Sequence, residues 1–197
     1  MKVSNILVAL TMSFFTAGAS AASPSFDCNN DSLSGAEQAI CQSEMLSQLD
    51  RQMSEVYKKA KAVDDKQAGQ HTLKAEQVGW IRGRNECWKS NDEEPCLKQE
   101  YEYRIAELQT RYRLVGNFGA EFYACDGNKA KEVVLTRYMT DPTTLMAEFG
   151  DSSVFMAASD KDGLFLGRNE KVQYEDEGMV AVQWGYEAPL MKCRLRD

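Results

Sequence analysis

Six cysteines constrain the fold of this 197-residue chain more than any other feature of its sequence. Cys28, Cys41, Cys87 and Cys96 lie in the first half, and Cys125 and Cys193 bracket most of the remainder. An even number of cysteines indicates disulfide bonds when a chain is exported to an oxidising compartment. The spacing therefore predicts two units, of which the second is closed by a bond between its first and last strands.

The first 21 residues have the three parts of a secretory signal. Lys2 provides the basic start, an apolar run extends from Ile6 to Phe15, and Ala19-Ser20-Ala21 is the predicted cleavage site. This run is shorter than the roughly 20 apolar residues that cross a bilayer. No cysteine follows the small residues as a point for lipid attachment. We therefore predict a signal peptide over 1–21 and a mature protein that is soluble in the periplasm or secreted, without stable membrane insertion.

The region from 22 to 115 has the periodicity of helices. Apolar residues recur every three or four positions from Leu46 to Ala60, which predicts a helix over 43–63. A second helix is predicted from about Thr72 to Cys87, and a third begins near Pro95, which suits a first helical turn. A shorter helix is expected between 34 and 41. Short connections favour antiparallel packing of these helices as a hairpin or bundle domain.

The region from 119 to 197 changes to a period of two, which is typical of strands. Turn signals at intervals of about ten residues predict about eight strands, and closure into a small antiparallel barrel would remove exposed sheet edges. The predicted fold class is therefore α+β, a helical domain followed by an eight-stranded β-barrel. The connection over 113–119 is short, which favours a fixed orientation of the two domains.

The pairing of the first four cysteines is not determined by the sequence, because three pairings are possible. Short loops at helix ends favour Cys28 with Cys41 and Cys87 with Cys96. A cross-pairing of the first segment onto the region of Cys87 remains open at this stage.

The chain has few groups that could support catalysis. His71 is the sole histidine and lies in a polar stretch between two predicted helices, so it is interpreted as a solvated loop residue. The densest group of carboxylates, 175–177, falls in a predicted turn, where no apolar pocket would raise a carboxyl pKa. The cysteine spacing does not suit zinc, and glycine-rich phosphate loops are absent from the sequence. We predict a protein that is not an enzyme and has no metal or cofactor.

The charge balance of the chain indicates the kind of partner that it could bind. Acidic residues outnumber basic ones by 30 to 23, which disfavours nucleic acid because phosphate binding requires a surplus of lysine and arginine. A basic protein is the better-matched partner for such a surface.

The first half resembles the LprI-like family of exported bacterial domains over about 26–112. The matching residues are Phe26-Asp27-Cys28, Ala39-Ile40-Cys41, Leu49-Asp50-Arg51, Tyr57, Gln77, Trp80, Arg84-Asn85-Glu86-Cys87, Cys96-Leu97, Tyr101, Arg104 and Leu108. The family includes a lysozyme inhibitor. The resemblance implies an exported disulfide-bonded domain more firmly than it implies an activity.

The second half resembles the MliC-like inhibitors of C-type lysozyme over about 119–194. The matching segments are Tyr123-Ala124-Cys125, Val172-Gln173-Tyr174, Gly185-Tyr186-Glu187-Ala188-Pro189-Leu190 and the terminal Cys193. This resemblance implies an eight-stranded barrel tied by one disulfide. In that family a loop serine and a lysine enter the lysozyme cleft. Here the loop reads Gly167-Arg168-Asn169-Glu170-Lys171, without serine, and Trp184 stands at the position of the lysine.

These resemblances predict a periplasmic protein that binds and inhibits a basic C-type lysozyme by inserting barrel loops into its cleft. Trp184, Tyr186 and Tyr174 cluster near the last predicted hairpins, where a barrel rim would present them outward to a partner, and packing in the core is the equal alternative for Trp184. The predicted partner-binding residues are Arg168, Lys171, Gln173, Tyr174, Trp184, Tyr186 and Glu187. The alternative is an envelope-maintenance or stress-related binding module that keeps the same scaffold without inhibiting lysozyme.

Overall fold

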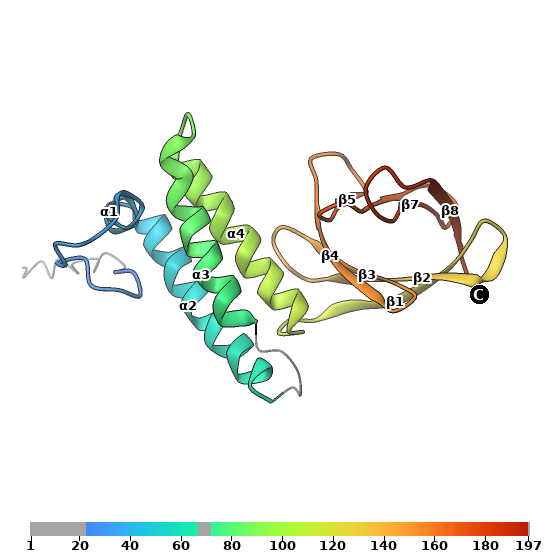
Figure 1. The fold of residues 1–197 in the computed structure, drawn as a ribbon, viewed down its shortest axis with the longest axis horizontal. Coiled ribbons are helices and arrows are strands. Elements are labelled where there is room, and N and C mark those ends of the chain that lie inside the picture. The colour runs from blue at the N-terminus through green and yellow to red at the C-terminus, as the bar shows by residue number, and fades with distance from the viewer. Residues whose placement is uncertain (1–22, 67–71, 197) are drawn as a thin grey trace, which may run out of the picture.

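The computed structural model describes residues 23–66 and 72–196 (Figure 1). The predicted signal peptide and His71 lie outside the described residues. Helices in the first half are followed by a closed antiparallel barrel of eight strands, which confirms the predicted α+β fold class. Within the two described ranges, no helix has both the length and the apolar character needed to cross a bilayer.

The described part of the helical half contains four α-helices and one 3-10 helix. They are α1 (Gly35–Gln42), α2 (Glu44–Asp64), α3 (Leu73–Arg84), η1 (Asn85–Lys89) and α4 (Glu93–Arg111). Ser34 begins α1 through a capping box with Glu37, and the side chain of Ser43 caps α2. The second predicted helix is interrupted, because α3 ends at Arg84 and Cys87 lies in the tighter η1 turn.

The core of the helical half combines apolar side chains with a buried polar network. The apolar part is formed by Ile40, Leu46, Met53, Leu73, Leu97, Ile105 and Leu108. At its centre Arg84 donates a 2.7 Å hydrogen bond to the Tyr101 hydroxyl, which donates at 2.8 Å to Asp50. The Arg84 guanidinium also lies 5.5 Å from the centre of the Trp80 ring. Opposite charges and shared hydrogen bonds are what allow these ionised groups to be buried.

The barrel half consists of eight short strands in simple up-and-down order. The strands are β1 (Asn117–Cys125), β2 (Asn128–Tyr138), β3 (Thr144–Phe149), β4 (Ser152–Ala158), β5 (Leu164–Leu166), β6 (Lys171–Tyr174), β7 (Met179–Gln183) and β8 (Leu190–Leu195). Each strand pairs with the next, and β1 also pairs with β8, which closes the barrel. The interior is filled by side chains from alternate positions, including Val133, Leu135, Leu145, Met156, Val172, Val180 and Val182.

All six cysteines form disulfides within their own halves. Cys28 bonds to Cys41 and Cys87 to Cys96, so the local pairing favoured from loop length is the one in the structure. The bond between Cys125 and Cys193 joins β1 to β8 at paired positions of the ladder. It therefore fastens the seam of the barrel, where the first and last strands meet.

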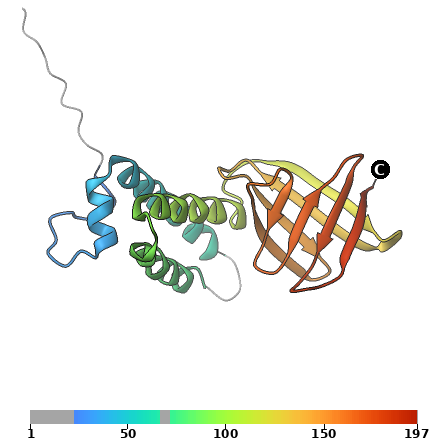
Figure 2. The ribbon, with the colours of Figure 1, turned by 90° about the horizontal axis from the view of Figure 1, so that it is seen from above.

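The two halves meet where α4 packs on β3 and β4. The hydroxyls of Thr110 and Thr144 form a buried hydrogen bond across the junction. Nearby, the rings of Tyr103 and Phe155 meet edge to face with centroids 5.5 Å apart. Figure 1 shows α4 next to the barrel, with α2 and α3 on the other side of α4, and Figure 2 shows the barrel beyond one end of α4.

Candidate functional site

The barrel has two ends that differ in the side chains they carry. Lys171 pairs with Gln183 across β6 and β7, so the β5–β6 and β7–β8 turns lie at the same end. We call this the Trp184 end, and it also contains the β1–β2 and β3–β4 turns. The opposite end, where Tyr174 pairs with Val180, is called the Tyr174 end.

A tight turn over 167–170 presents Arg168 at the Trp184 end. The backbone N–H of Gly167 donates to the Glu170 carbonyl at 2.9 Å, and the Glu170 carboxylate accepts a 3.0 Å bond from the Asn169 backbone. Arg168 and Lys171 are both exposed, and neither forms an ion pair with another described residue. The turn thus places two cations close to each other in solvent.

The adjacent turn over 184–189 presents Tyr186. Gly185 has a φ of 105°, which a residue with a side chain rarely adopts. Its carbonyl accepts hydrogen bonds from the Gln183 side chain at 3.1 Å and the Ala188 backbone at 3.3 Å. Tyr186 is 77% exposed, and Glu187 beside it is also exposed. Tyr186 therefore projects from a turn whose backbone is held in place.

Trp184 points into the barrel rather than outward from its rim. It is half-buried against the apolar core, and its ring meets that of Phe149 edge to face with centroids 5.6 Å apart. The inward direction follows from strand alternation, because Trp184 continues the series of Val180 and Val182, whose side chains fill the interior. Of the two positions expected for this tryptophan, outward at the rim or packed in the core, the structure has the second, and the ring lies against Phe149 at the mouth of the barrel.

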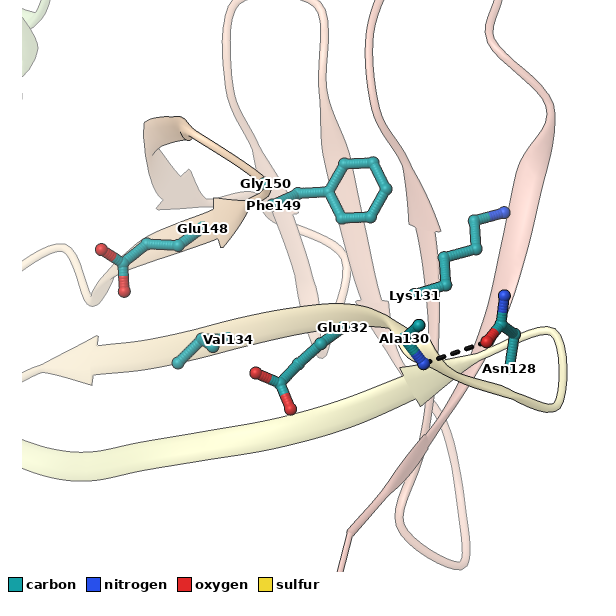
Figure 3. Close-up of a pocket in the computed structure, with 8 residues that line it drawn as sticks. All are labelled: Asn128, Ala130, Lys131, Glu132, Val134, Glu148, Phe149 and Gly150. Atoms are coloured by element: carbon teal, nitrogen blue, oxygen red, sulfur yellow. Dashed lines mark hydrogen bonds between the residues drawn. The ribbon is translucent and has the colours of Figure 1, made fainter.

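A surface cavity of about 490 Å³ lies beside the Trp184 end, between β2 and β3 (Figure 3). Its lining includes Lys131, Glu132, Glu148 and Phe149. The two carboxylates point to the same side, whereas Phe149 and Lys131 project away from them. Glu132 forms an ion pair with Arg196. Lys131 forms another, in which its Nζ atom lies 2.6 Å from Oδ2 of Asp126. Two of the three charged side chains in the lining are thus paired, and the third, Glu148, is exposed to solvent.

Two of the predicted partner-binding residues lie away from the others. Tyr174 points into the Tyr174 end, where its hydroxyl donates to Glu121 at 3.0 Å and the Arg137 guanidinium lies 5.2 Å from its ring centre. Burial in this cluster raises the pKa of Tyr174 above its usual value, and burial raises the pKa of Tyr123 to about 12. The Gln173 amide donates to the Asp162 carbonyl at 3.0 Å and so supports the β4–β5 loop.

The structure therefore gathers Arg168, Lys171, Trp184, Tyr186 and Glu187 at one end of the barrel and places Gln173 and Tyr174 toward the other. Their separation follows from the length of β6, which carries the chain from one end toward the other. The carboxylates at 175–177 lie exposed in and beside the β6–β7 turn, as expected from the sequence.

An exposed apolar surface on the helical half was not predicted from the sequence. Trp88 is 65% exposed, and Val78 and Ile81 are exposed on the preceding helix. We call these three side chains the α3–η1 face. Val78 and Ile81 are three positions apart, which is the spacing of one helical face and could have identified that part of the surface, whereas Trp88 lies past the end of α3 in the tighter η1 turn. The expectation that Trp80 and Tyr101 belong to the core agrees with their packing there.

Comparison with known proteins identifies the class of the helical half. Residues 28–108 match the family described as lysozyme inhibitor LprI, and thus form an LprI-family domain. Lipoprotein LprI of Mycobacterium tuberculosis is 24% identical over 164 residues, which cover 83% of this chain and 81% of the relative. Lipoprotein LprI of Mycobacterium bovis has the same identity and coverage. No solved structure matches this chain significantly. The resemblance of the barrel to MliC-like inhibitors remains a prediction.

Proposed function

We propose that this protein binds and inhibits lysozyme outside the cytoplasm and has no catalytic activity of its own. The match of residues 28–108 to a family of lysozyme inhibitors carries the proposal. A periplasmic location is supported by the predicted signal and by three disulfides, which oxidising compartments favour. A basic lysozyme of the C-type is the partner we propose, because the net charge of −7 would speed its encounter with this chain.

The Trp184 end supplies groups suited to the lysozyme cleft. Lysozyme hydrolyses its substrate between two carboxyl groups, and a cation placed near them would form charge-assisted hydrogen bonds. Arg168 and Lys171 are exposed cations beside the projecting ring of Tyr186. We propose that these side chains enter the cleft, while Trp184 supports the turn from inside the barrel.

The test is a titration of the mature chain against C-type and g-type lysozymes, with muramidase rate and binding heat as the two measurements. We expect inhibition of a C-type enzyme, and an increase in Kd of about tenfold or more in the Arg168→Ala/Lys171→Ala variant. The matched control is Lys161→Ala/Arg194→Ala, which removes the same charge from exposed positions outside these turns.

The outcomes separate the two functions considered. If the wild-type chain binds none of the lysozymes, the inhibitor proposal fails and the envelope-maintenance module becomes the better hypothesis. If the wild type inhibits but both double variants retain its affinity, lysozyme inhibition stands and the insertion of these barrel turns is refuted. An equal gain of affinity in both variants would show that net charge, rather than the position of the two cations, determines binding, because a more acidic chain attracts a basic lysozyme more strongly.

A further inference from the structure

The guanidinium of Arg137, at the Tyr174 end of the barrel, lies among groups that leave its N–H donors unused. Its Cζ atom is 5.2 Å from the centre of the Tyr174 ring and 5.5 Å from the centre of the Phe118 ring. The carboxylate paired with it, that of Glu121, has its Oε1 atom 3.6 Å from Nη2, which is too long for a hydrogen bond. The buried Nε of Arg137 has no hydrogen-bond partner among the described residues. A buried donor without a partner calls for an explanation.

A surface cavity of about 500 Å³ lies beside this guanidinium. Its lining includes Arg137, Phe165 and Tyr174 from the strands, together with the loop over 159–163 that connects β4 to β5. Cavities that bind small molecules usually measure about 300 to 1,000 Å³ and combine apolar or aromatic side chains with a few polar groups. Arg137 lines the cavity and 40% of its side chain is exposed, so a molecule in the cavity can reach it.

The loop over 159–163 is held against β6 by hydrogen bonds. The backbone N–H of Tyr174 donates to the Gly163 carbonyl at 2.9 Å. The side-chain amide of Gln173 donates to the Asp162 carbonyl at 3.0 Å, so this residue supports the wall of the cavity. A loop that is already fixed loses little conformational entropy when a ligand binds, which favours binding.

The lining of the cavity carries charges of both signs. Its charged residues are the basic Arg137 and Lys161 and the acidic Asp160 and Asp162. The three on the loop are exposed, and none of them forms an ion pair with another described residue. Glu121 adds a further negative charge beside the arginine. A dianion such as phosphate would be repelled by these carboxylates, whereas a molecule with one carboxylate and one ammonium finds an opposite charge for each.

We propose that this cavity binds a zwitterionic ligand, namely an amino acid or a short peptide with free termini. The carboxylate of the ligand pairs with Arg137, because a planar guanidinium can donate two parallel hydrogen bonds to a carboxylate. The Tyr174 ring beside the guanidinium holds it in position. The ammonium of the ligand pairs with Asp160 and Asp162 on the loop. The inference does not depend on lysozyme binding, because the Tyr174 end lies opposite the turns proposed to enter the lysozyme cleft.

Calorimetric titration of the mature chain with L-alanyl-L-alanine tests the proposal. We expect saturable binding of the dipeptide, with a Kd about tenfold higher or more for its N-acetylated form, for its C-terminal amide and for inorganic phosphate. Arg137→Lys keeps the charge but loses the planar group, and should raise the Kd of the dipeptide by about tenfold. Arg168→Lys is the matched control at the other end of the barrel, and its Kd should stay within about twofold of the wild type.

A second variant tests the ammonium site without changing the interior of the barrel. Asp160→Asn/Asp162→Asn alters exposed carboxylates on the loop, so the fold should be retained. It should raise the Kd of the dipeptide by about tenfold and leave that of the N-acetylated dipeptide unchanged, because the acetylated form has no ammonium. Glu148→Gln/Asp151→Asn is the matched control, since it removes the same charge from exposed positions at the Trp184 end.

Three results would overturn the proposal. The first is a wild-type chain that does not bind the dipeptide, and the second is tighter binding of inorganic phosphate than of the dipeptide. The third is unchanged affinity for the dipeptide in both Arg137→Lys and Asp160→Asn/Asp162→Asn, which would place the ligand elsewhere on the protein. Thermal unfolding of each variant verifies that a loss of affinity is not a loss of the fold, and the loop variant decides the matter if Arg137→Lys unfolds.

Discussion

The two halves of the molecule have small cores that are stabilised in different ways. The helical half is organised around an ionised cluster, in which Asp50, Tyr101 and Arg84 are joined by hydrogen bonds among apolar side chains. The barrel excludes charge from its centre and closes its sheet on itself. Closure leaves the barrel without an open edge, whereas α3, at the side of the helical half, has a face that none of the other described helices or strands covers.

This difference accounts for the kind of surface each half offers. At the Trp184 end the barrel offers charged and aromatic side chains on tight turns, above an interior that is already filled. The helical half offers the apolar α3–η1 face on a rigid support. The barrel also exposes apolar side chains on its strands, among them Phe122, Leu166 and Leu190, so its turns differ from its walls mainly in the cations and the tyrosine that they carry.

The largest expected effect tests the closure of the barrel. Cys125 and Cys193 are 68 positions apart, so their bond restricts a long loop of the unfolded chain. Replacing both with alanine should lower the free energy of unfolding of the barrel by about 4 kcal/mol in the chain-entropy description. Urea unfolding, followed by far-ultraviolet circular dichroism of the strand signal, measures this loss.

The corresponding change in the helical half is the control. Cys87 and Cys96 are only nine positions apart, and their replacement should cost about 3 kcal/mol by the same relation. If the barrel variant lost less stability than the helical one, the seam between β1 and β8 would be maintained by the sheet itself, and the comparison of the halves would need revision.

The second effect tests the ionised cluster. Asp50→Ala leaves the Arg84 guanidinium buried without its carboxylate, which should cost the helical half about 3 kcal/mol. Glu121→Ala is the barrel counterpart, because Glu121 accepts from Tyr174 near Arg137 but remains partly exposed. We expect a smaller loss there, since solvent can hydrate the remaining arginine. Tryptophan fluorescence during urea unfolding reports on both variants, and equal losses would show that burial does not distinguish the clusters.

Much of the fold could be predicted because its signals are local. The three-and-four spacing from Leu46 to Ala60 anticipates α2 within one residue at each end, and alternation with regular turns anticipates all eight strands. The interruption at Arg84 could not be predicted in this way. Arg84 is drawn into the core by Asp50 and Tyr101, which are distant in sequence, and the Cys87 disulfide constrains the tighter turn that follows.

The candidate site could be predicted only in part, because neighbours in sequence need not be neighbours on a barrel. The turns that carry Arg168 and Tyr186 can be recognised from their glycines. The inward direction of Trp184 depends on its register with Val182, and the position of Tyr174 depends on the length of β6. The exposure of Trp88 could not be predicted from helical spacing, because this residue lies in the tighter η1 turn, whereas Trp80 on α3 packs in the core.

The smallest expected effect on stability distinguishes a residue that supports a turn at the Trp184 end from a residue that contacts the partner there. Trp184→Ala removes a half-buried ring that packs on Phe149, and should lower the free energy of unfolding by about 2 kcal/mol, less than for a fully buried tryptophan. Tyr186→Ala changes an exposed side chain on the adjacent turn and should alter stability by less than about 0.5 kcal/mol. Thermal and urea unfolding give both values.

Binding measurements on the same two variants complete the comparison. Tyr186→Ala should weaken lysozyme binding while unfolding as the wild type does, because its ring is already in solvent. Trp184→Ala should weaken binding only to the extent that the turn over 184–189 loses its support, so its affinity should recover at lower temperature, where the fold is restored. If Trp184→Ala instead retains full stability and loses affinity, the ring contacts the partner directly. Its packing against Phe149 would then not persist in solution, and the outward position at the rim would be the correct one.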